Sequence, residues 1–467
     1  MSTTPHLAVV PAPRPRELTD LGNAERLVDR HGADLRWCPA WGSWLAWDGR
    51  RWRQDDDGEA VRRMKDTARA IHTEAALAGD PDEQARTAKW AIRSQSHRAI
   101  RDALALAQSE PGVPVAVDEL DADPWALNLA NGTLDVRTAE LRPHRREDLI
   151  TRLAPVEWDP EARHEVWERF LAEATGGDQA LEGFLRRAAG YTLTGSTAEE
   201  VLFMAFGPAA TGKSPFLEAL KAVLGDYART ADFESFLARR DSGGARADIA
   251  RLAGARMVAS VEVDDGKRLA EALVKQIVGG DTVTARFLYQ AAFEFTPRFA
   301  LWLAANHAPR LRDDDEGMWR RIRRVPFDHV VPPGRRDPRV KAVLRDPGDA
   351  GPAILRWAVD GAREWLADGL SVPEAVARST EAYRAEVDPI RDFLEDRCVL
   401  SDHAWVSVTS LRKAYEEWCE QVGEHPLGAR AFNDRVRSKG CEQDRRRLGG
   451  HLVRGWAGVG LSSEVTA

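Results

Sequence analysis

Cysteine is scarce in this sequence, and the few cysteines present lie far apart. The 467 residues include four, Cys38, Cys398, Cys419 and Cys441, and none of them has the C-x2-C spacing of a zinc site. Neither a zinc ribbon nor a disulfide framework is supported, and we expect buried, reduced thiols.

Long apolar runs and an excess of basic charge are also missing. No stretch approaches the roughly 18 to 20 consecutive apolar residues that cross a bilayer, and the N-terminus has no basic-then-apolar signal pattern. The net charge of −8 argues against a surface coated in basic charge for nucleic acid, although it leaves room for local basic patches. We therefore expect a soluble, cytoplasmic protein that makes no membrane contact.

The chain does contain enough apolar material for more than one core. It is 43% hydrophobic and 30% charged, so it is too long for one compact core and too apolar to be mostly disordered. Residues 1–16 carry four prolines and little pattern, which favours a flexible tail. Residues 17–160 predict an α/β domain, with helical periodicity over residues 60–110.

Two turn signals in this region predict β-hairpins. Asp48-Gly49 lies inside a tryptophan cluster at residues 37–52, and Asn131-Gly132 separates two apolar runs. Tryptophan at this density either packs a small β-unit or stacks on bases.

The most informative segment is residues 201–224, which read VLFMAFGPAATGKSPFLEALKAVL. An apolar strand, a glycine-rich turn and an amphipathic helix surround a match to G-x-x-x-x-G-K-[ST]. In such a loop the glycines let backbone N–H groups curve around a phosphate, the lysine reaches the β- and γ-phosphates, and the hydroxyl holds Mg2+. The predicted nucleotide-binding residues are Gly207, Pro208, Ala209, Ala210, Thr211, Gly212, Lys213, Ser214 and Pro215.

Two later strands predict the other half of this site. An apolar run leads to Glu262, Asp264 and Asp265, which would hold Mg2+ and orient water unless they form a solvated acidic turn. A second apolar run ends in Asn306, which would sense the γ-phosphate or simply form a turn.

A short arginine run follows these two strands. The stretch MWRRIRRVPF contains Arg320 and Arg321, which would either stabilise transition-state charge across a subunit interface or belong to a basic surface strand.

These motifs, in this order, carry a resemblance to a known family. The quoted segments are GPAATGKS, EVDDGKRLAEALVKQIVGGDTVTAR, FTPRFALWLAANHAP and MWRRIRRVPF. They resemble the superfamily 3 helicases, closest to the primase-helicases of phages, satellite phages and plasmids, with the poxvirus primase-helicases more distant. The resemblance implies an AAA+-like motor that assembles as a ring, usually a hexamer, and moves 3′ to 5′ along single-stranded DNA.

The family's functional residues carry over to matching positions here. ATP and Mg2+ are the implied cofactors, and Ser214, Asp264 and Asp265 are the implied metal ligands. The implied catalytic residues are Lys213, the Walker B acids Asp264 and Asp265 with Glu262, the sensor Asn306, and the arginine finger, which Arg321 matches best and Arg320 second.

The resemblance also implies a DNA-contacting hairpin in the central channel. The stretch VKQIVGGDTVTARFLY makes Lys275, Arg286 and Tyr289 the candidates, because a basic group suits a phosphate and an aromatic ring suits a base. The alternative for Arg286 and Tyr289 is ordinary cross-strand packing.

Larger relatives often carry a primase-polymerase domain before the motor. Here residues 17–160 show neither a cysteine-rich zinc motif nor a convincing catalytic constellation of paired carboxylates and histidine. We therefore expect a stand-alone helicase, or else an ATPase that loads a replication complex without unwinding, with any priming supplied by a partner.

The C-terminal segment predicts a DNA-binding domain. Its order of helix, strand, helix, helix and arginine-rich hairpin fits a winged helix. The stretch from Arg430 to Arg454 contains eight basic residues and three acidic ones. This local excess of positive charge suits origin DNA, but it also suits a protein-docking or solvated surface. The DNA-binding candidates are Arg435, Arg437, Lys439, Arg445, Arg446 and Arg447.

The predicted fold is α/β: an AAA+-like P-loop NTPase core with an α/β N-terminal domain and a C-terminal winged-helix domain. The expected partners are single-stranded DNA in the ring, origin duplex at the C-terminus, further copies of the chain and replication proteins of a phage, plasmid or integrated element. The predicted boundaries are 1–16, 17–160, 161–335, 336–385 and 386–467.

Overall fold

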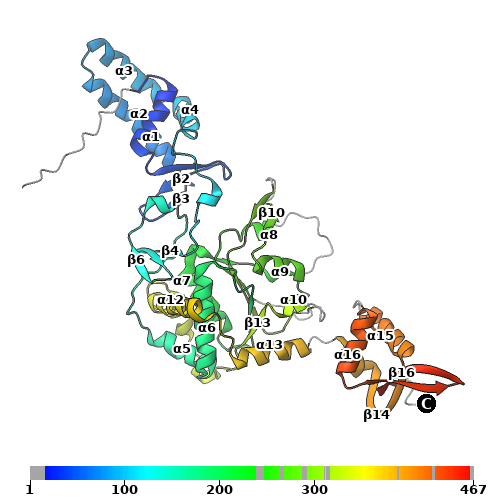
Figure 1. Cartoon of the computed structure of the whole chain (residues 1–467). Helices are drawn as coiled ribbons and strands as arrows, with labels where there is room; N and C mark the ends of the chain where they lie inside the picture. Colours follow the sequence, from blue (N-terminus) through cyan, green and yellow to red (C-terminus); the bar gives the residue numbers. More distant parts are fainter. Residues whose placement is uncertain are drawn as a thin grey trace, which may run out of the picture.

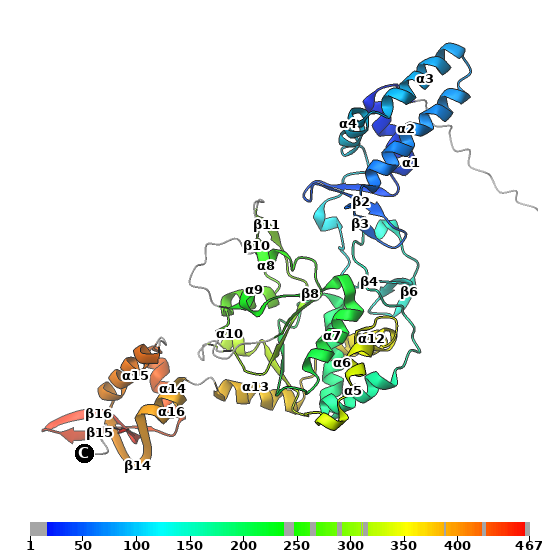
Figure 2. The ribbon, with the colours of Figure 1, turned by 180° about the vertical axis from the view of Figure 1, so that it is seen from behind.

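The computed structural model arranges the chain as three parts in a row. Figures 1 and 2 show the N-terminal helices at one end, the parallel sheet with its covering helices in the middle, and the C-terminal part at the other end. The tail predicted at residues 1–16 lies outside the described residues except for Arg16. The structure describes residues 16–237, 247–261, 268–286, 292–309, 311, 316–386, 389–422 and 426–462.

The N-terminal part combines a helical group with two small antiparallel sheets. Both predicted hairpins are confirmed: β2 pairs with β3 around Asp48-Gly49, and β4 pairs with β5 around Asn131-Gly132. The elements are α1 (Asp20–His31), β1 (Leu35–Cys38), β2 (Ser43–Trp47), β3 (Trp52–Gln54), α2 (Glu59–Leu77), α3 (Pro81–Ser94), α4 (His97–Ala107), β4 (Ala126–Leu129), β5 (Gly132–Asp135) and β6 (Glu140–Arg142).

Most of the clustered tryptophans pack within this part. Trp37 and Trp44 meet edge to face with ring centroids 5.5 Å apart, and Trp47 lies 5.8 Å from the fully buried Trp52. Aromatic pairs at such distances contribute beyond their buried area. Of the two interpretations of this cluster, packing is the one that these four side chains support; Trp41 is 42% exposed.

The middle part is built on five parallel strands in the order β13-β7-β12-β9-β8. Along β7, Phe203 and Ala205 enter one core, while Leu202 and Met204 enter the core on the other face. Because both faces are buried, the central strands β7 and β12 read as unbroken apolar runs rather than alternating ones. The strands are β7 (Leu202–Phe206), β8 (Ala228–Thr230), β9 (Met257–Val261), β12 (Ala300–Ala305) and β13 (Ile322–Pro326).

Helices cover this sheet, and a hairpin extends from it. Helices α6 and α12 approach so closely that a Cβ at Gly361 would lie 1.9 Å from the Arg186 carbonyl oxygen, so only glycine fits there. The elements are α5 (Glu165–Thr175), α6 (Gln179–Thr194), α7 (Lys213–Leu224), α8 (Ala247–Ala250), α9 (Glu271–Val278), β10 (Val283–Ala285), β11 (Phe293–Phe295), α10 (Glu316–Trp319), α11 (Pro338–Arg345), α12 (Gly351–Asp368) and α13 (Glu374–Glu386).

The C-terminal part has its own core around Phe393, Tyr415, Phe432 and Trp456. Its elements follow the predicted order of helix, strand, helix, helix and hairpin, and its sheet has the order β14-β16-β15. They are α14 (Pro389–Arg397), β14 (Cys398–Ser407), α15 (Val408–Val422), α16 (Ala429–Ser438), β15 (Glu442–Leu448) and β16 (His451–Leu461). All four cysteines of the chain are free thiols; Cys38, Cys419 and Cys441 are buried, as predicted, whereas Cys398 is half-buried. No helix among the described residues has the length and apolar character needed to cross a membrane.

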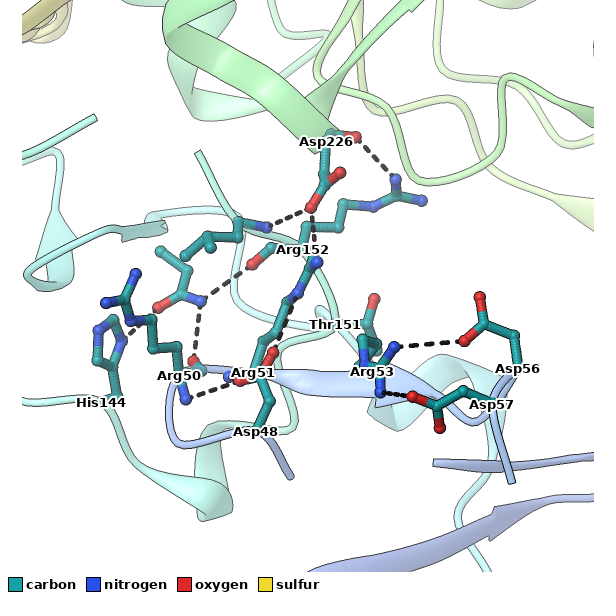
Figure 3. A network of polar contacts seen from close by, with 12 residues as sticks. Asp48, Arg50, Arg51, Arg53, Asp56, Asp57, His144, Thr151, Arg152 and Asp226 are labelled. Atoms are coloured by element: carbon teal, nitrogen blue, oxygen red, sulfur yellow. Dashed lines mark hydrogen bonds and ion pairs between the residues drawn. The ribbon is translucent and has the colours of Figure 1, made fainter. Parts of the chain in front are cut away.

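A polar network joins the N-terminal part to the middle part. Figure 3 shows Arg51 and Arg152 converging on Asp226: Arg51 forms an ion pair with its carboxylate, and Arg152 donates to its backbone oxygen at 3.0 Å. The Leu153 amide also donates to the Asp226 carboxylate, at 3.0 Å. Because Arg51 and Arg152 come from the chain around β1–β6 and Asp226 lies between α7 and β8, the two parts meet through specific polar contacts rather than through a bare linker.

Arg256 strengthens the same junction from inside. Its buried guanidinium donates to the carbonyl oxygens of Leu193 and Ala126, both at 2.7 Å, and lies 4.7 Å from the ring centroid of Tyr227. Burial lowers the pKa of this guanidinium below its ordinary value. A buried cation bonded to carbonyl oxygens ties β4 and α6 to the strand that begins at Met257.

Replacing Arg256 with methionine is expected to lower the free energy of unfolding by about 3–5 kcal/mol, because buried carbonyl oxygens lose their charged donor. Urea denaturation followed by tryptophan fluorescence measures the loss. Arg298→Met is the matched control, since exposed Arg298 donates to the Ala122 carbonyl oxygen at 3.3 Å. Its cost should stay within about 0.5 kcal/mol, and equal costs for the two variants would contradict the argument.

Candidate functional site

The glycine-rich loop lies between β7, which ends at Phe206, and α7, which begins at Lys213. Gly207 has a φ of +148°, and a Cβ there would lie 2.0 Å from the Phe327 carbonyl oxygen, so any other residue would collide with backbone. Gly212 has a φ of +96°, a conformation that glycine adopts at little cost. The two glycines fixed by the motif are therefore required by the shape of the loop.

Lys213 is held inside this loop. Its Nζ donates to the carbonyl oxygens of Gly207 and Pro208, both at 2.6 Å, and its side chain is buried. Burial lowers the pKa of the ammonium, and the nearby carboxylate of Asp328 opposes that shift. Ser214 follows in the first turn of α7, where backbone N–H groups lack intrahelical partners and the helix dipole favours an anion. The arrangement places a cation, a hydroxyl and a helix N-terminus around one loop, which suits a phosphate group.

The carboxyl ends of two further strands lie at the same edge of the sheet. Ala305 of β12 is the partner of Phe206 in the parallel ladder, so the exposed Asn306 follows its strand beside the loop. Strand β9 pairs with β12 through Val261 and Ala304, and therefore ends at this edge too.

The predicted acidic residues Glu262, Asp264 and Asp265 come directly after β9 in the sequence but lie outside the described residues. Within the described ranges, no group of three or more histidine, cysteine, aspartate or glutamate side chains could hold a metal ion. The assignment of Asp264 and Asp265 as metal ligands, with Ser214, stays a prediction.

The predicted arginine finger lies at the opposite edge of the sheet. Arg321 directly precedes β13, and its backbone oxygen accepts from the Leu202 amide at the start of β7. Five residues of β7, at about 3.3 Å each, separate this position from the loop by about 17 Å. Neither Arg320 nor Arg321 can therefore reach the loop of its own chain.

The two arginines differ in how they are held. Arg321 is bound to the carboxylate of Glu200 and donates to the Gly317 carbonyl oxygen at 2.9 Å, and its side chain is only 12% exposed. Arg320 has a 69% exposed side chain whose nearest nitrogen lies 3.9 Å from the same carboxylate. Only Arg320 is thus free to extend from the surface without breaking a close ion pair.

The channel-hairpin candidates are only partly described. Strands β10 and β11 pair antiparallel, Val283 with Phe295, so a hairpin is present where the sequence predicted one. Lys275 lies half-buried on α9 and Arg286 lies exposed at the end of β10, whereas Tyr289 lies outside the described residues. Their role as DNA contacts stays a prediction.

Arginines of the C-terminal hairpin separate into two groups. Arg445 stands directly opposite Arg454 on neighbouring strands, and Arg447 stands opposite Leu452. Like charges directly opposite one another destabilise a strand pair unless an anion lies between them. Arg446, in contrast, forms an ion pair with Asp444 at 3.1 Å.

The remaining basic candidates cluster at the end of α16. Arg437 forms an ion pair with Asp434 at 2.9 Å and lies 5.9 Å from the ring centroid of Trp456, while Arg435 and Lys439 belong to the same turn. The described ion pairs include none for Arg445, Arg447 or Arg454. This unpaired face of the hairpin has the charge that a nucleic-acid backbone requires.

Sequence reasoning missed the segment after β13, residues 327–331. Its Phe327 amide donates to the Phe206 carbonyl oxygen at 2.7 Å, and its Val331 amide donates to the Ala210 carbonyl oxygen at 3.0 Å. One end of the segment is therefore fixed to the end of β7 and the other to the glycine-rich loop. No motif marks residues 328–331, because their position depends on how β13 pairs with β7.

The fold and the loop together define a class: a mixed α/β protein with a parallel five-stranded sheet of the P-loop type. Three family models match parts of the chain: "D5 N terminal like" over residues 24–176, a family described only as of unknown function over 205–324, and "Poxvirus D5 protein-like" over 385–439. Two of these models describe D5-like domains, so the chain is similar in these parts to the primase-helicases that its motifs resemble.

Relatives of large DNA viruses carry corresponding names. "Putative helicase L207/L206" of Acanthamoeba polyphaga mimivirus is 26% identical over 65% of this chain and 34% of its own length. "Putative helicase 022R" of Frog virus 3 is 25% identical over 74% of this chain and 43% of its own length. The chain thus spans less than half the length of these relatives. Among solved structures, the C-terminal region of NrS-1 is 11% identical and covers 94% of this chain and 99% of its own, with a TM-score of 0.49.

Proposed function

We propose that this protein is an ATP-dependent DNA helicase that works as a ring in the replication of a mobile or viral-type element. One observation carries the proposal: the loop with Lys213 and Ser214, the strand that Asn306 follows and the strand that precedes Glu262 share one edge of the parallel sheet. The names of the viral relatives support helicase activity.

The residues around the loop fit a nucleotide with Mg2+. Gly207 to Ser214 would hold the phosphates, with Lys213 on the β- and γ-phosphates. Ser214, Asp264 and Asp265 are oxygen ligands of the kind that Mg2+ prefers, and the ion would neutralise charge that develops on the phosphates. Asn306 would orient the attacking water. These assignments make the middle part an AAA+-like motor.

The position of the arginines supports assembly into a ring. Because Arg320 and Arg321 lie at the sheet edge opposite their own loop, an arginine finger from this run can act only on a neighbouring subunit. A closed ring, a hexamer in the family's usual form, gives every loop such a neighbour. We infer that Arg320 is the finger and that Arg321 holds Glu200.

DNA would be bound at two places. Lys275 and Arg286 would grip single-stranded DNA in the channel, together with Tyr289. The C-terminal part would act as a winged helix that binds duplex, with Arg445 and Arg447 on phosphates. Arg446, paired and close to Trp405, would instead stabilise the hairpin.

Strand displacement on a duplex with a 3′ single-stranded tail is the experiment that tests this function. We expect ATP-dependent displacement on the 3′-tailed duplex and none on a 5′-tailed control, because the motor is proposed to move 3′ to 5′. ATPase activity is read in the same tubes, with and without single-stranded DNA. DNA-stimulated ATPase without displacement from either tail would contradict the helicase and favour the loader.

A further inference from the structure

Residues 328–330, after β13, form an exposed surface beside the glycine-rich loop. Asp328 and His329 are exposed, and Val330 is 48% exposed. The Phe327 amide donates to Phe206, directly before the loop, and the Val331 amide donates to Ala210, in the middle of the loop. These bonds place the three side chains beside the loop.

The His329 side chain also contacts the end of helix α5. A Cβ at Gly176 would lie 2.0 Å from the His329 Nε2 and 2.2 Å from its Cε1, so the imidazole rests on the backbone where α5 ends. Gly176 has a φ of +61°, which permits this close approach. Helix α5 in turn contacts the loop, since Phe170 lies 3.1 Å from the Cβ position of Gly212. The ring is thus positioned between α5 and the loop.

The order of the strands decides which part of a nucleotide lies on this side. Strand β7 has β12 on one side and β13 on the other. Asn306, which would act on the terminal phosphate, follows β12. A terminal phosphate next to Asn306 would lie on the β12 side of the loop, and the rest of the nucleotide would then leave the loop toward β13, where His329 lies.

We propose that His329 stacks on the base of the bound nucleotide, with the α5 terminus at Gly176 as its support. This inference rests on the proposed nucleotide site and adds the contact that distinguishes a nucleotide from inorganic phosphate. Histidine is among the aromatic side chains that stack on bases, and every base offers a π-face. The contact therefore selects nucleotides over inorganic triphosphate but discriminates little between adenine and guanine.

The test compares the affinities of the whole chain for ATP and for inorganic triphosphate, both with Mg2+, by calorimetry. Wild-type protein should bind ATP more tightly than triphosphate. His329→Ala should weaken ATP binding roughly tenfold and leave triphosphate binding unchanged, since base stacking on an aromatic side chain has about this effect. His329→Phe should restore ATP binding, and His97→Ala, at an exposed histidine of α4, should change neither affinity.

The other outcomes separate this inference from the proposed function. Unchanged ATP binding by His329→Ala would overturn the stacking role. Equal weakening of ATP and triphosphate would also overturn it, because the ring would then act by supporting the loop. If wild-type protein binds triphosphate as tightly as ATP, the loop is a phosphate site and the base contact is wrong. If it binds neither, the proposed nucleotide site itself fails and this inference fails with it.

Discussion

Lys213→Ala is expected to reduce ATP turnover to the background of the assay. The Nζ atom lies inside the glycine-rich loop, 2.6 Å from two loop carbonyl oxygens. A bound phosphate would replace these oxygens as the partner of the Lys213 ammonium. Loss of one preorganised charge at a transferring phosphoryl group costs at least about 10²-fold in rate, and nucleotide binding loses the same contact. Phosphate release under saturating ATP and Mg2+ measures the change.

Lys221→Ala is the matched control for this variant. Lys221 lies on the same helix, α7, but its Nζ donates to the Thr230 hydroxyl at 2.5 Å, away from the loop. The turnover of Lys221→Ala should stay close to that of the wild type, because Lys221 does not contact the loop. Its fold should also be intact, because a substitution at such a site usually changes stability by no more than about 0.5 kcal/mol. Duplex binding by the C-terminal part should survive in both variants. Retained turnover in Lys213→Ala would show that the loop assignment is wrong.

Arg320→Ala is expected to lower ATP turnover by about 10³-fold while leaving ATP binding intact. An arginine finger acts on charge that develops in the transition state, so its removal affects rate rather than ground-state affinity. Arg321→Ala is the comparison: loss of its ion pair with Glu200 should affect stability more than the rate of hydrolysis. Turnover and ATP affinity, measured for both variants, decide between the two arginines.

Mixed assemblies test whether the finger acts across an interface. Lys213→Ala subunits have an intact arginine, and Arg320→Ala subunits have an intact loop. Mixing two inactive preparations should therefore restore part of the activity at interfaces that combine the intact halves. No recovery at any mixing ratio, with both variants assembled, would exclude a finger that acts in trans at Arg320. Recovery in mixtures of Lys213→Ala with Arg321→Ala subunits, and not with Arg320→Ala subunits, would assign the finger role to Arg321, the better sequence match.

Strong local signals made much of the fold predictable. Asp48-Gly49 and Asn131-Gly132 each predicted a hairpin because few dipeptides accept the backbone of a tight turn. The strand, loop and helix of residues 201–224 followed from the glycine spacing and from the change of hydrophobic period. The order of elements after residue 389 followed from the same patterns, although the pattern did not reveal which arginines of the hairpin are paired.

Other features depended on pairs of residues that are far apart in the chain. Sequence matching preferred Arg321 over Arg320, but only the structure shows that Arg321 is bound to Glu200, 121 residues earlier. The role of Arg256 at the junction needs carbonyl oxygens 63 and 130 residues away. Neither contact leaves a periodic or motif signal, because a carbonyl oxygen can come from any residue type.

The sequence by itself therefore predicted the glycine-rich loop, the strands that lead to its edge and the resemblance to the primase-helicases. It did so because backbone conformation and phosphate chemistry restrict a few adjacent positions to glycine, lysine and serine. Only the tertiary structure decided that the arginine run lies at the edge away from its own loop and that His329 lies beside the loop. Those positions are set by the pairing of β13 with β7 and by the contact of α5 with the loop, which bring together residues that no local pattern connects.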